Sequence, residues 1–388
     1  MCKIAPTIVN PAGRFRVVVT KRLPGSRWQE VLVAADCRLE ILNGQDTLRE
    51  EQLVQVIGER CAAVISQLTE EWTAPVLDAL ASAGGKIISA YAVGHDNIDV
   101  AAATRLGLAV GNTPGVLTEA TAEMAVALTF SAARRIVHAD EWVRGGQFQG
   151  WQPTMMLGDL LWRKTLGVIG AGRIGSAYSR MMVEGHKMNL LYASRRPNRE
   201  LERRVAAYNA CLTSLGDDPV SVARATSLDE LLREADVVSL HVPLSDETRH
   251  LIGARQLAEM KPTAILVNTS RGPVIDEAAL VDHCRQCPSF HAALDVFEEE
   301  PALHPGLDRL ENVVLTPHLG SATSWTREGM AALAALNVVA VLHEWPAWHH
   351  ADALDDVMPF LAQHPPKAAP SLVNAEQLGL GHLSPYSP

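Results

Sequence analysis

Thr165-Leu-Gly-Val-Ile-Gly170-Ala-Gly172-Arg173-Ile174-Gly175 runs from a strand pattern through a glycine-rich turn into a helix pattern. Residues 165–169 are apolar with β-branched side chains, as in a buried strand. Apolar residues then recur with helical spacing over 173–183. The Gly-x-Gly-x-x-Gly turn between them predicts a βαβ unit whose helix N-terminus binds the phosphates of a dinucleotide.

Each glycine of this turn has a separate expected role. Gly170 permits the tight turn, Gly172 leaves room for a diphosphate against the backbone, and Gly175 allows the helix to pack closely on the strand. The alternative is an ordinary glycine-rich turn. A strand before the glycines and a helix after them favour dinucleotide binding.

Length and composition set the broad class of the protein. The 388 residues suggest two domains, and 47% hydrophobic with 20% charged residues is typical of a globular enzyme. The formal net charge is −10, no long basic run occurs, and no apolar stretch has the length of a membrane span. We therefore expect neither a nucleic-acid partner nor a membrane partner.

The six cysteines are too scattered for a disulfide framework. Cys284 and Cys287 form a Cys-x-x-Cys beside His283, but no second ligand pair follows, so no metal site is predicted. Two incidental thiols near a helix end are the favoured interpretation, and a redox switch is the alternative.

Strand and helix patterns alternate along the chain, which predicts an α/β fold with parallel sheets covered on both faces. The predicted strands are 16–20, 63–66, 86–90, 165–169, 188–193, 237–241, 264–268, 291–295 and 313–316. The predicted helices are 50–58, 74–83, 117–133, 173–183, 228–234, 254–260, 277–284 and 324–342. Residues 206–225 are interpreted as a surface insertion, and the tail after Trp348 as irregular.

Between Asp140 and Arg163 the periodic pattern is lost, although Trp142, Trp151 and Trp162 are present. Large apolar side chains on an irregular segment need burial. The favoured interpretation is a subunit interface, and the alternative is a local cap on the core.

Three loops that follow predicted strands each carry one ionisable residue: Arg271, Glu300 and His318. Ligands of open α/β sheets bind outside the carboxyl ends of the strands, so these loops can converge. A guanidinium can hold the carboxylate and polarise the ketone of a 2-keto acid. An imidazole can donate a proton near neutral pH, and a paired carboxylate orients its ring. A nicotinamide supplies the hydride.

The glycine loop and these three residues resemble the D-isomer-specific 2-hydroxyacid dehydrogenases, and most closely the plant-type hydroxypyruvate reductases (glycerate dehydrogenases) of photorespiration. The segments that carry the resemblance are 111–119, 169–178, 270–280, 294–301 and 325–331. It implies a Rossmann-like cofactor domain over 113–317, with a dimerisation arm at about 134–163. It also implies a flavodoxin-like substrate domain built from 1–112 and 318–388, and a homodimer.

The resemblance also implies roles for individual residues. Arg271, Glu300 and His318 would be catalytic, and the backbone of Val93 and Gly94 would bind the substrate carboxylate together with Arg271. The implied cofactor contacts are Thr121, Gly170, Gly172, Arg173, Ile174, Gly175, Ser194, Arg195, Arg196, His241, Pro243, Thr269, Asp295, His318 and Gly320.

Two features depart from the family pattern. After the strand 188–193, an NAD-specific site carries an acid that binds the ribose hydroxyls, but this chain has Ser194 followed by Arg195 and Arg196. We therefore expect NADP(H) or NAD(H) as cofactor, with a preference for NADPH. Plant relatives end in Ser-Lys-Leu, whereas this sequence ends Leu383-Ser-Pro-Tyr-Ser-Pro388. Import into peroxisomes by that signal is not predicted, and mitochondrion, cytosol or another peroxisomal route stay open.

The expected activity is reduction of hydroxypyruvate to D-glycerate, with glyoxylate as a second substrate. Two alternatives are kept. One is a dehydrogenase for D-lactate or phosphoglycerate, and the other is a cofactor-sensing corepressor of the same fold.

Overall fold

The computed structural model describes residues 6–44, 46–348 and 354–383. Its chain divides into two compact units. The split unit comprises Met1–Thr118 and Ala322–Pro388, and the central unit comprises Glu119–Ser321. The central unit therefore begins after residue 118 and ends before residue 322, whereas the substrate domain expected from the sequence ends at 112 and resumes at 318.

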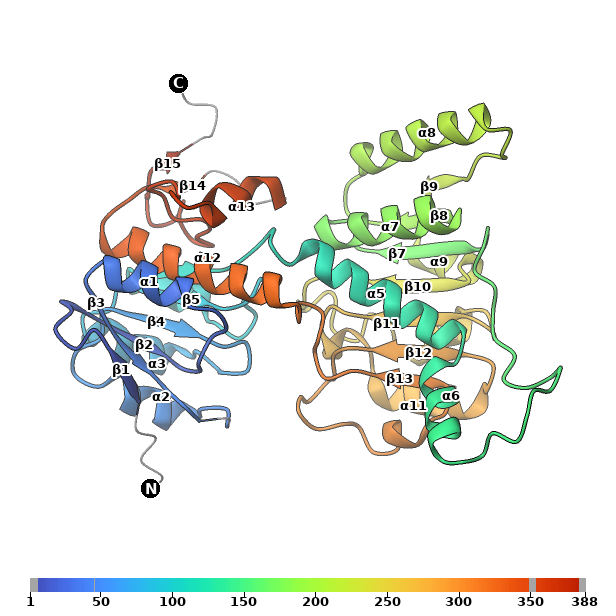
Figure 1. Cartoon of the computed structure of the whole chain (residues 1–388), viewed down its shortest axis with the longest axis horizontal. Helices are drawn as coiled ribbons and strands as arrows, with labels where there is room; N and C mark the ends of the chain where they lie inside the picture. The colour runs from blue at the N-terminus through green and yellow to red at the C-terminus, as the bar shows by residue number, and fades with distance from the viewer. Residues whose placement is uncertain (1–5, 45, 349–353, 384–388) are drawn as a thin grey trace. The chain divides into compact units, whose positions relative to one another are not determined.

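In its described residues, the split unit contains a six-stranded sheet in the order β1-β3-β2-β4-β5-β6 (Figure 1) and a two-stranded sheet of β14 (Ala347–Trp348) and β15 (His382–Leu383). Only β1 is antiparallel to its neighbour. The strands are β1 (Thr7–Val9), β2 (Phe15–Val19), β3 (Cys37–Ile41), β4 (Ala63–Ser66), β5 (Ile87–Ala90) and β6 (Ala109–Gly111).

Helices cover both faces of this sheet because the strands are apolar on both sides. On one face, α1 (Arg27–Ala34) packs with α12 (Ser324–Leu342), whose alanines allow close approach to β5. On the other face, Val64 and Ile88 pack in one buried cluster with residues of three helices. These helices are α2 (Glu50–Ile57), α3 (Ala74–Ser82) and α4 (Val100–Arg105).

The central unit contains one sheet of seven strands in its described residues, in the order β13-β12-β11-β10-β7-β8-β9, all parallel. The strands are β7 (Thr165–Ile169), β8 (Asn189–Ala193), β9 (Val222–Arg224), β10 (Val237–Leu240), β11 (Ile265–Asn268), β12 (His291–Leu294) and β13 (Val313–Leu315). The chain leaves β7 to build β8 and β9 on one side and returns to build β10 on the other. That reversal is the switch point where doubly wound sheets bind ligands.

Two hydrophobic clusters enclose this sheet. One joins β7 and β10 to α5 (Thr118–Ala133), α7 (Arg173–His186) and α8 (Arg199–Ser214). The other joins the opposite face to α9 (Leu228–Glu234), α10 (Ala254–Glu259) and α11 (Glu277–Gln286). Both units therefore have parallel α/β sheets, as the alternating sequence pattern predicts.

The structure adds detail to one expectation and corrects another. Residues 206–225 lie mostly exposed on the surface, as an insertion would, but they have regular structure: they complete α8, where Leu212 is buried, and then form the edge strand β9. The tail is not irregular throughout, because it forms α13 (Leu354–Leu361), which buries Val357 and Phe360. In both cases a few buried residues at helical spacing outweigh a polar or proline-rich composition.

Residues 136–162 begin with α6 (Ile136–Arg144), which lacks buried residues, and then become irregular. Leu161 is buried in the core of the unit, but four other large apolar side chains are exposed: Trp151 by 78%, Leu160 by 71%, Leu157 by 69% and Trp162 by 56%. A local cap on the core would bury these side chains, so that alternative is wrong for them.

Among the residues that the model describes, no helix has both the length and the apolarity that a membrane crossing requires.

Candidate active site

The glycine loop of the central unit connects β7 to α7. Gly170 has a φ of +95°, and a Cβ there would lie 2.5 Å from the carbonyl oxygen of His241. A Cβ on Gly175 would lie 2.1 Å from the carbonyl oxygen of Gly170. Side chains at these two positions would clash with backbone, so the turn requires glycine at both.

Gly172 has open space beside it: a Cβ at this position would have no atom within 4 Å. It caps α7, whose first residues Arg173 and Ile174 present their N–H groups at the helix N-terminus. Open space beside a helix N-terminus is what the approach of a diphosphate requires. Thr269, after β11, has a buried hydroxyl that lacks a hydrogen-bond partner among the described residues. Both observations fit a dinucleotide at this edge of the sheet.

The loop after β8 carries Ser194, Arg195 and Arg196, and both arginines are exposed. Ser194 Oγ donates a hydrogen bond to the carbonyl of Arg196 at 2.5 Å. Arg224 on β9 donates to the carbonyl oxygens of Ser194 (2.8 Å) and Arg195 (3.2 Å). Asn198 donates to the carbonyl of Ala171 at 2.9 Å, which ties this loop to the glycine loop.

Sequence reasoning missed both Arg224 and Asn198. Arg224 lies in the segment that was interpreted as an insertion, so nothing indicated that it would pair with the loop after β8. Asn198 also caps α8 by accepting a hydrogen bond from Leu201 N at 2.9 Å. An asparagine before a helix pattern is the signal that could have identified it.

His241 follows β10, and its Nε2 hydrogen-bonds with Ser239 Oγ at 2.9 Å. Its ring lies 5.2 Å from that of Tyr178. Burial lowers the pKa of His241 to about 3, so this imidazole is neutral at physiological pH. Pro243 lies exposed nearby, and its carbonyl accepts a hydrogen bond from Thr248.

The loops after β12 and β13 bring Glu300 and His318 together. His318 Nδ1 lies 3.0 Å from Glu300 Oε2, and the two side chains are 25% and 24% exposed. Glu300 Oε1 accepts a hydrogen bond from Phe297 N at 3.1 Å. Burial by itself raises the pKa of Glu300, but the hydrogen bond and charge of His318, with the Phe297 N–H and the Arg271 charge, hold it below its ordinary value.

An ionised Glu300 only accepts hydrogen bonds, so the proton of this pair lies on His318 Nδ1. In this tautomer of the neutral imidazole, Nε2 is the ring nitrogen without a hydrogen.

Asp295, at the end of β12, fixes the backbone beside His318. It is 1% exposed, and its oxygens accept hydrogen bonds from Thr316 Oγ1 (2.6 Å), Leu319 N (2.7 Å) and Gly320 N (2.7 Å). His318 itself has a φ of +55°, and its N–H donates to the Asp295 carbonyl at 2.8 Å. A non-glycine residue in the left-handed region needs such support from its surroundings.

Thr121, on α5, lies beside the same loop. A Cβ on Gly320 would be 3.3 Å from Thr121 Cγ2 and 3.2 Å from Asp295 Oδ2. Thr121, Asp295 and Gly320 therefore form one tight contact next to His318.

Arg271 follows β11 and precedes the short 3-10 helix η1 (Gly272–Val274). Asn268 donates to its carbonyl at 2.8 Å, and its Nη1 donates to the carbonyl of Ser270 at 2.9 Å. Its positive charge contributes to the lowered pKa of Glu300. Arg271, Glu300 and His318 thus come from the carboxyl ends of three adjacent parallel strands, and the charge of Arg271 acts on the Glu300–His318 pair.

Val93 and Gly94 belong to the split unit, in the loop after β5. Asn112 Nδ2 donates to the Val93 carbonyl at 2.9 Å, and Thr113 N donates to the Ala92 carbonyl at 2.9 Å. Among the described residues, the N–H groups of Val93 and Gly94 have no protein acceptor. Two unpaired N–H groups at the carboxyl edge of a sheet can bind a carboxylate.

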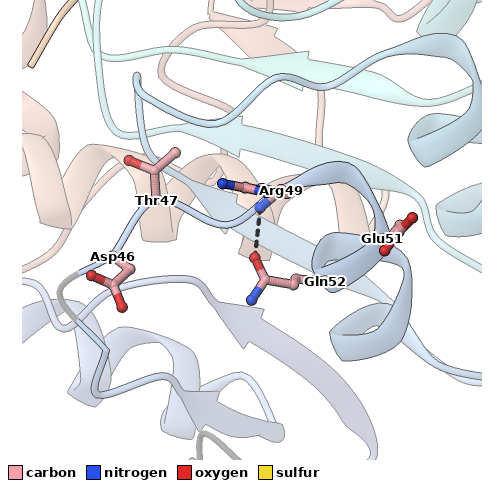
Figure 2. A pocket seen from close by; sticks show the side chains of 5 residues that line it. All are labelled: Asp46, Thr47, Arg49, Glu51 and Gln52. Atoms are coloured by element: carbon pink, nitrogen blue, oxygen red, sulfur yellow. Dashed lines mark hydrogen bonds between the residues drawn. The ribbon is translucent and has the colours of Figure 1, made fainter. Parts of the chain in front are cut away.

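A separate hollow in the split unit has a different lining. The hollow in Figure 2 is lined by Asp46, Thr47, Arg49, Glu51 and Gln52, and Gln52 accepts a hydrogen bond from Arg49 N. It lies at the start of α2, and its mixed charges form no acid–base pair.

The Cys-x-x-Cys lies at the C-terminal end of α11. Burial, with the charge of Cys287, raises the pKa of Cys284 to about 12, so its reactive thiolate is rare at neutral pH. This supports the interpretation as incidental thiols. Within the described part of the chain, no group of three or more His, Cys, Asp or Glu side chains could hold a metal ion.

Comparisons with known proteins show the family of the chain. Residues 126–320 match the family model of the D-isomer specific 2-hydroxyacid dehydrogenase NAD binding domain. The chain is 53% identical over 376 residues to peroxisomal glycerate dehydrogenase HPR of Arabidopsis thaliana, covering 96% of this chain and 97% of the relative. It is 41% identical over 329 residues to glyoxylate reductase of Thermococcus onnurineus, covering 84% and 92%.

Among solved structures, the fold is similar to an NADPH-dependent glyoxylate/hydroxypyruvate reductase from Sinorhizobium meliloti in complex with NADP and malonate. The TM-score is 0.68 at 28% sequence identity, covering 85% of this chain and 94% of the other.

The lowered pKa of Glu300 predicts a pH-dependent stability. Because the carboxylate is favoured in the folded state, its contribution is present above the ordinary value of 4.5 and is lost as pH falls through the lower folded pKa. We expect Glu300→Gln to reduce the free energy of unfolding at about pH 6, and the deficit to shrink at about pH 3.5. Urea unfolding of both proteins at the two pH values measures this difference in the free energy of unfolding. Glu299→Gln, at the exposed neighbouring carboxylate, is the control, and an equal deficit at both pH values would contradict the pairing.

Proposed function

Because the chain belongs to the D-isomer specific 2-hydroxyacid dehydrogenase family, we propose that it reduces hydroxypyruvate to D-glycerate and glyoxylate to glycolate. It is an enzyme with a nicotinamide-binding Rossmann domain. The observation that carries the proposal is the Glu300–His318 pair within the electrostatic influence of Arg271, at the same sheet edge as the glycine loop. A photorespiratory role, as the resemblance implies, is part of this proposal.

The catalytic roles follow from the charges of the three side chains. Arg271 pairs with the substrate carboxylate and polarises the ketone, since a guanidinium is always charged. A bound nicotinamide supplies the hydride to the keto carbon. His318 Nε2 donates its proton to the developing alkoxide, while Nδ1 stays hydrogen-bonded to Glu300. The carboxylate of Glu300 stabilises the protonated imidazole before transfer and orients the ring.

In the split unit, the N–H groups of Val93 and Gly94 receive the substrate carboxylate in this proposal. Thr121 and Asp295 would contact a bound nicotinamide, and the remaining acceptor capacity of the Asp295 carboxylate would suit its carboxamide. His241 and Pro243 would line the cofactor site. The Thr269 hydroxyl, which has no partner among the described residues, could hydrogen-bond to a bound cofactor. The neutral His241 imidazole would place no charge beside the uncharged ring of a reduced nicotinamide.

Replacement of the proton donor tests the reaction. We expect His318→Ala to lower kcat by about 10²- to 10⁴-fold, because it removes the general acid, and to leave cofactor binding intact. Turnover with hydroxypyruvate, glyoxylate, pyruvate and phosphohydroxypyruvate is followed by loss of reduced-nicotinamide absorbance, and cofactor binding by fluorescence. His250→Ala is a matched control, since His250 pairs with Glu298 on an exposed surface of the same unit. Wild-type turnover in the His318 variant would reject the role.

We further propose that NADPH is preferred over NADH. The acid that would bind the ribose hydroxyls and repel a 2′-phosphate is replaced by Ser194, and two exposed arginines follow. The hydrogen bonds from Arg224 hold the backbone that carries Arg195.

The test compares kcat/KM for the two cofactors. We expect the double variant Arg195→Ala/Arg196→Ala to lower kcat/KM for NADPH by about 10- to 100-fold, as for the loss of charged hydrogen bonds to phosphate, with little change for NADH. Arg203→Ala, at an exposed arginine of α8, is the control. A strong preference of the wild type for NADH would refute this proposal.

We also propose that two copies of the chain associate through the arm at about 134–163. The support is the exposed apolar set Phe148, Trp151, Leu157, Leu160 and Trp162, more than an isolated protein surface ordinarily carries on one segment. We expect sedimentation of a dimer at micromolar concentration, and a monomer for Trp151→Asp/Leu160→Asp. A wild-type monomer under these conditions would overturn the proposal.

A further inference from the structure

The C-terminal residues 371–374 extend the sheet of the split unit beside the edge strand β6. Leu372 forms an antiparallel bridge with Gly111, and Val373 N donates to the Val110 carbonyl at 2.7 Å. Asn374, which is 1% exposed, accepts from Val110 N at 2.9 Å through its Oδ1. Its Nδ2 donates to Thr104 Oγ1 and to the Leu108 carbonyl, both at 2.9 Å. This segment is therefore fixed in the unit by buried hydrogen bonds.

Ser371 connects the same segment to the residue that follows β6. Its Oγ donates to Asn112 Oδ1 at 2.6 Å, although the two residues are 259 positions apart in the sequence. Asn337 of α12, which is fully buried, holds both partners: its Oδ1 accepts from Ser371 N at 2.9 Å, and its Nδ2 donates to the Asn112 carbonyl at 2.9 Å. Three distant parts of the chain thus meet in one polar network.

The Asn112 amide is held at both of its ends. The Val93 carbonyl only accepts hydrogen bonds, so Nδ2 is the end that donates to it, at 2.9 Å. Oδ1 accepts from the Ser371 hydroxyl at 2.6 Å, and this second hydrogen bond restrains the position of the amide. A flipped amide would place an oxygen against the Val93 carbonyl and lose that hydrogen bond.

Fixing the Val93 carbonyl also fixes the N–H of Gly94. The two groups belong to one planar trans peptide, so they point in opposite directions. In the same way, the hydrogen bond from Thr113 N to the Ala92 carbonyl fixes the peptide that carries Val93 N–H. Residues 112 and 113 therefore aim two successive N–H groups away from β6, and neither has a protein acceptor among the described residues.

We propose that Ser371 and Asn112 are positioning residues for substrate: through the Val93 carbonyl they hold the N–H of Gly94 in the orientation that binds the substrate carboxylate. This inference rests on the proposed function, because it takes the loop 92–95 as the carboxylate site. It assigns to the C-terminal segment a part in setting the KM for the 2-keto acid. Neither residue contacts the reacting atoms.

The test uses the full chain with hydroxypyruvate and glyoxylate as probes. We expect Ser371→Ala to raise KM for both acids about three- to tenfold, which corresponds to the loss of one partly buried neutral hydrogen bond. We expect kcat and the KM for cofactor to stay within about twofold of the wild type. Ser371→Thr, which keeps the hydroxyl, restores the wild-type KM. Asn112→Ala raises KM at least as much, and the double variant raises it no further, because both residues act through one hydrogen bond to Val93.

Thr104→Val is the matched control for stability. It removes the acceptor of Asn374 Nδ2 at the other end of the segment, outside the path to Val93. We expect it to lower Tm with an unchanged KM. An unchanged KM in Ser371→Ala, an equal rise in Thr104→Val, or a multiplied effect in the double variant would each overturn the proposal.

A second readout separates this inference from the proposed function. Amide hydrogen exchange in a peptide that covers 91–98 should be faster in Ser371→Ala than in wild type or Thr104→Val. If the wild type reduces neither acid, the proposed function fails. Faster exchange in Ser371→Ala would then still support the conclusion that Ser371 restrains the loop 92–95. Unchanged exchange in Ser371→Ala would overturn the positioning role, whatever the activity of the enzyme.

Discussion

The carboxylate of Asp295 holds in place the loop of the central unit that carries His318. It is almost fully buried, and three hydrogen bonds from Thr316, Leu319 and Gly320 offset the cost of burying its charge. Its backbone carbonyl accepts from His318 N, which supports the positive φ of that residue. Without this anchor, His318 would relax toward an ordinary backbone conformation and lose its alignment with Glu300. The acid–base pair therefore depends on an interaction between the ends of two parallel strands, β12 and β13.

The sequence predicts the parts of the fold that repeat a regular pattern. The strand, glycine turn and helix at 165–186 follow from local residue types, and the parallel order of strands brings Arg271, Glu300 and His318 to one sheet edge. The steric requirement at Gly175 is also local, since a Cβ there would meet the carbonyl of Gly170. The requirement at Gly170 is partly tertiary, because a Cβ there would meet the carbonyl of His241 after β10, although its positive φ belongs to the turn itself.

Other parts could not be predicted because their cause is tertiary. The helix α8 has a polar composition, and only its contacts with the sheet explain why Leu201, Val205 and Leu212 are buried. Asn112, Asn337 and Ser371 have no periodicity, and their network forms only because β6, α12 and the C-terminal segment meet. Arg224 could be placed only once β9 was known to be the edge strand beside β8. Buried polar residues that pair across long sequence separations leave no local signal.

Two histidines in the central unit show how environment assigns chemistry to one residue type. His241 follows β10, and burial lowers its pKa to about 3, so it stays neutral and cannot deliver a proton near pH 7. His318 is partly exposed and faces Glu300, a carboxylate whose pKa is held below its ordinary value and which therefore stays ionised. That carboxylate accepts the hydrogen bond from Nδ1, and Nε2 is the nitrogen that would transfer a proton in the proposed reaction. The same type of side chain is thus a buried, uncharged group after β10 and the proposed proton donor after β13, three strands away in the sheet. Burial at the first position and one hydrogen-bonded carboxylate at the second make the difference.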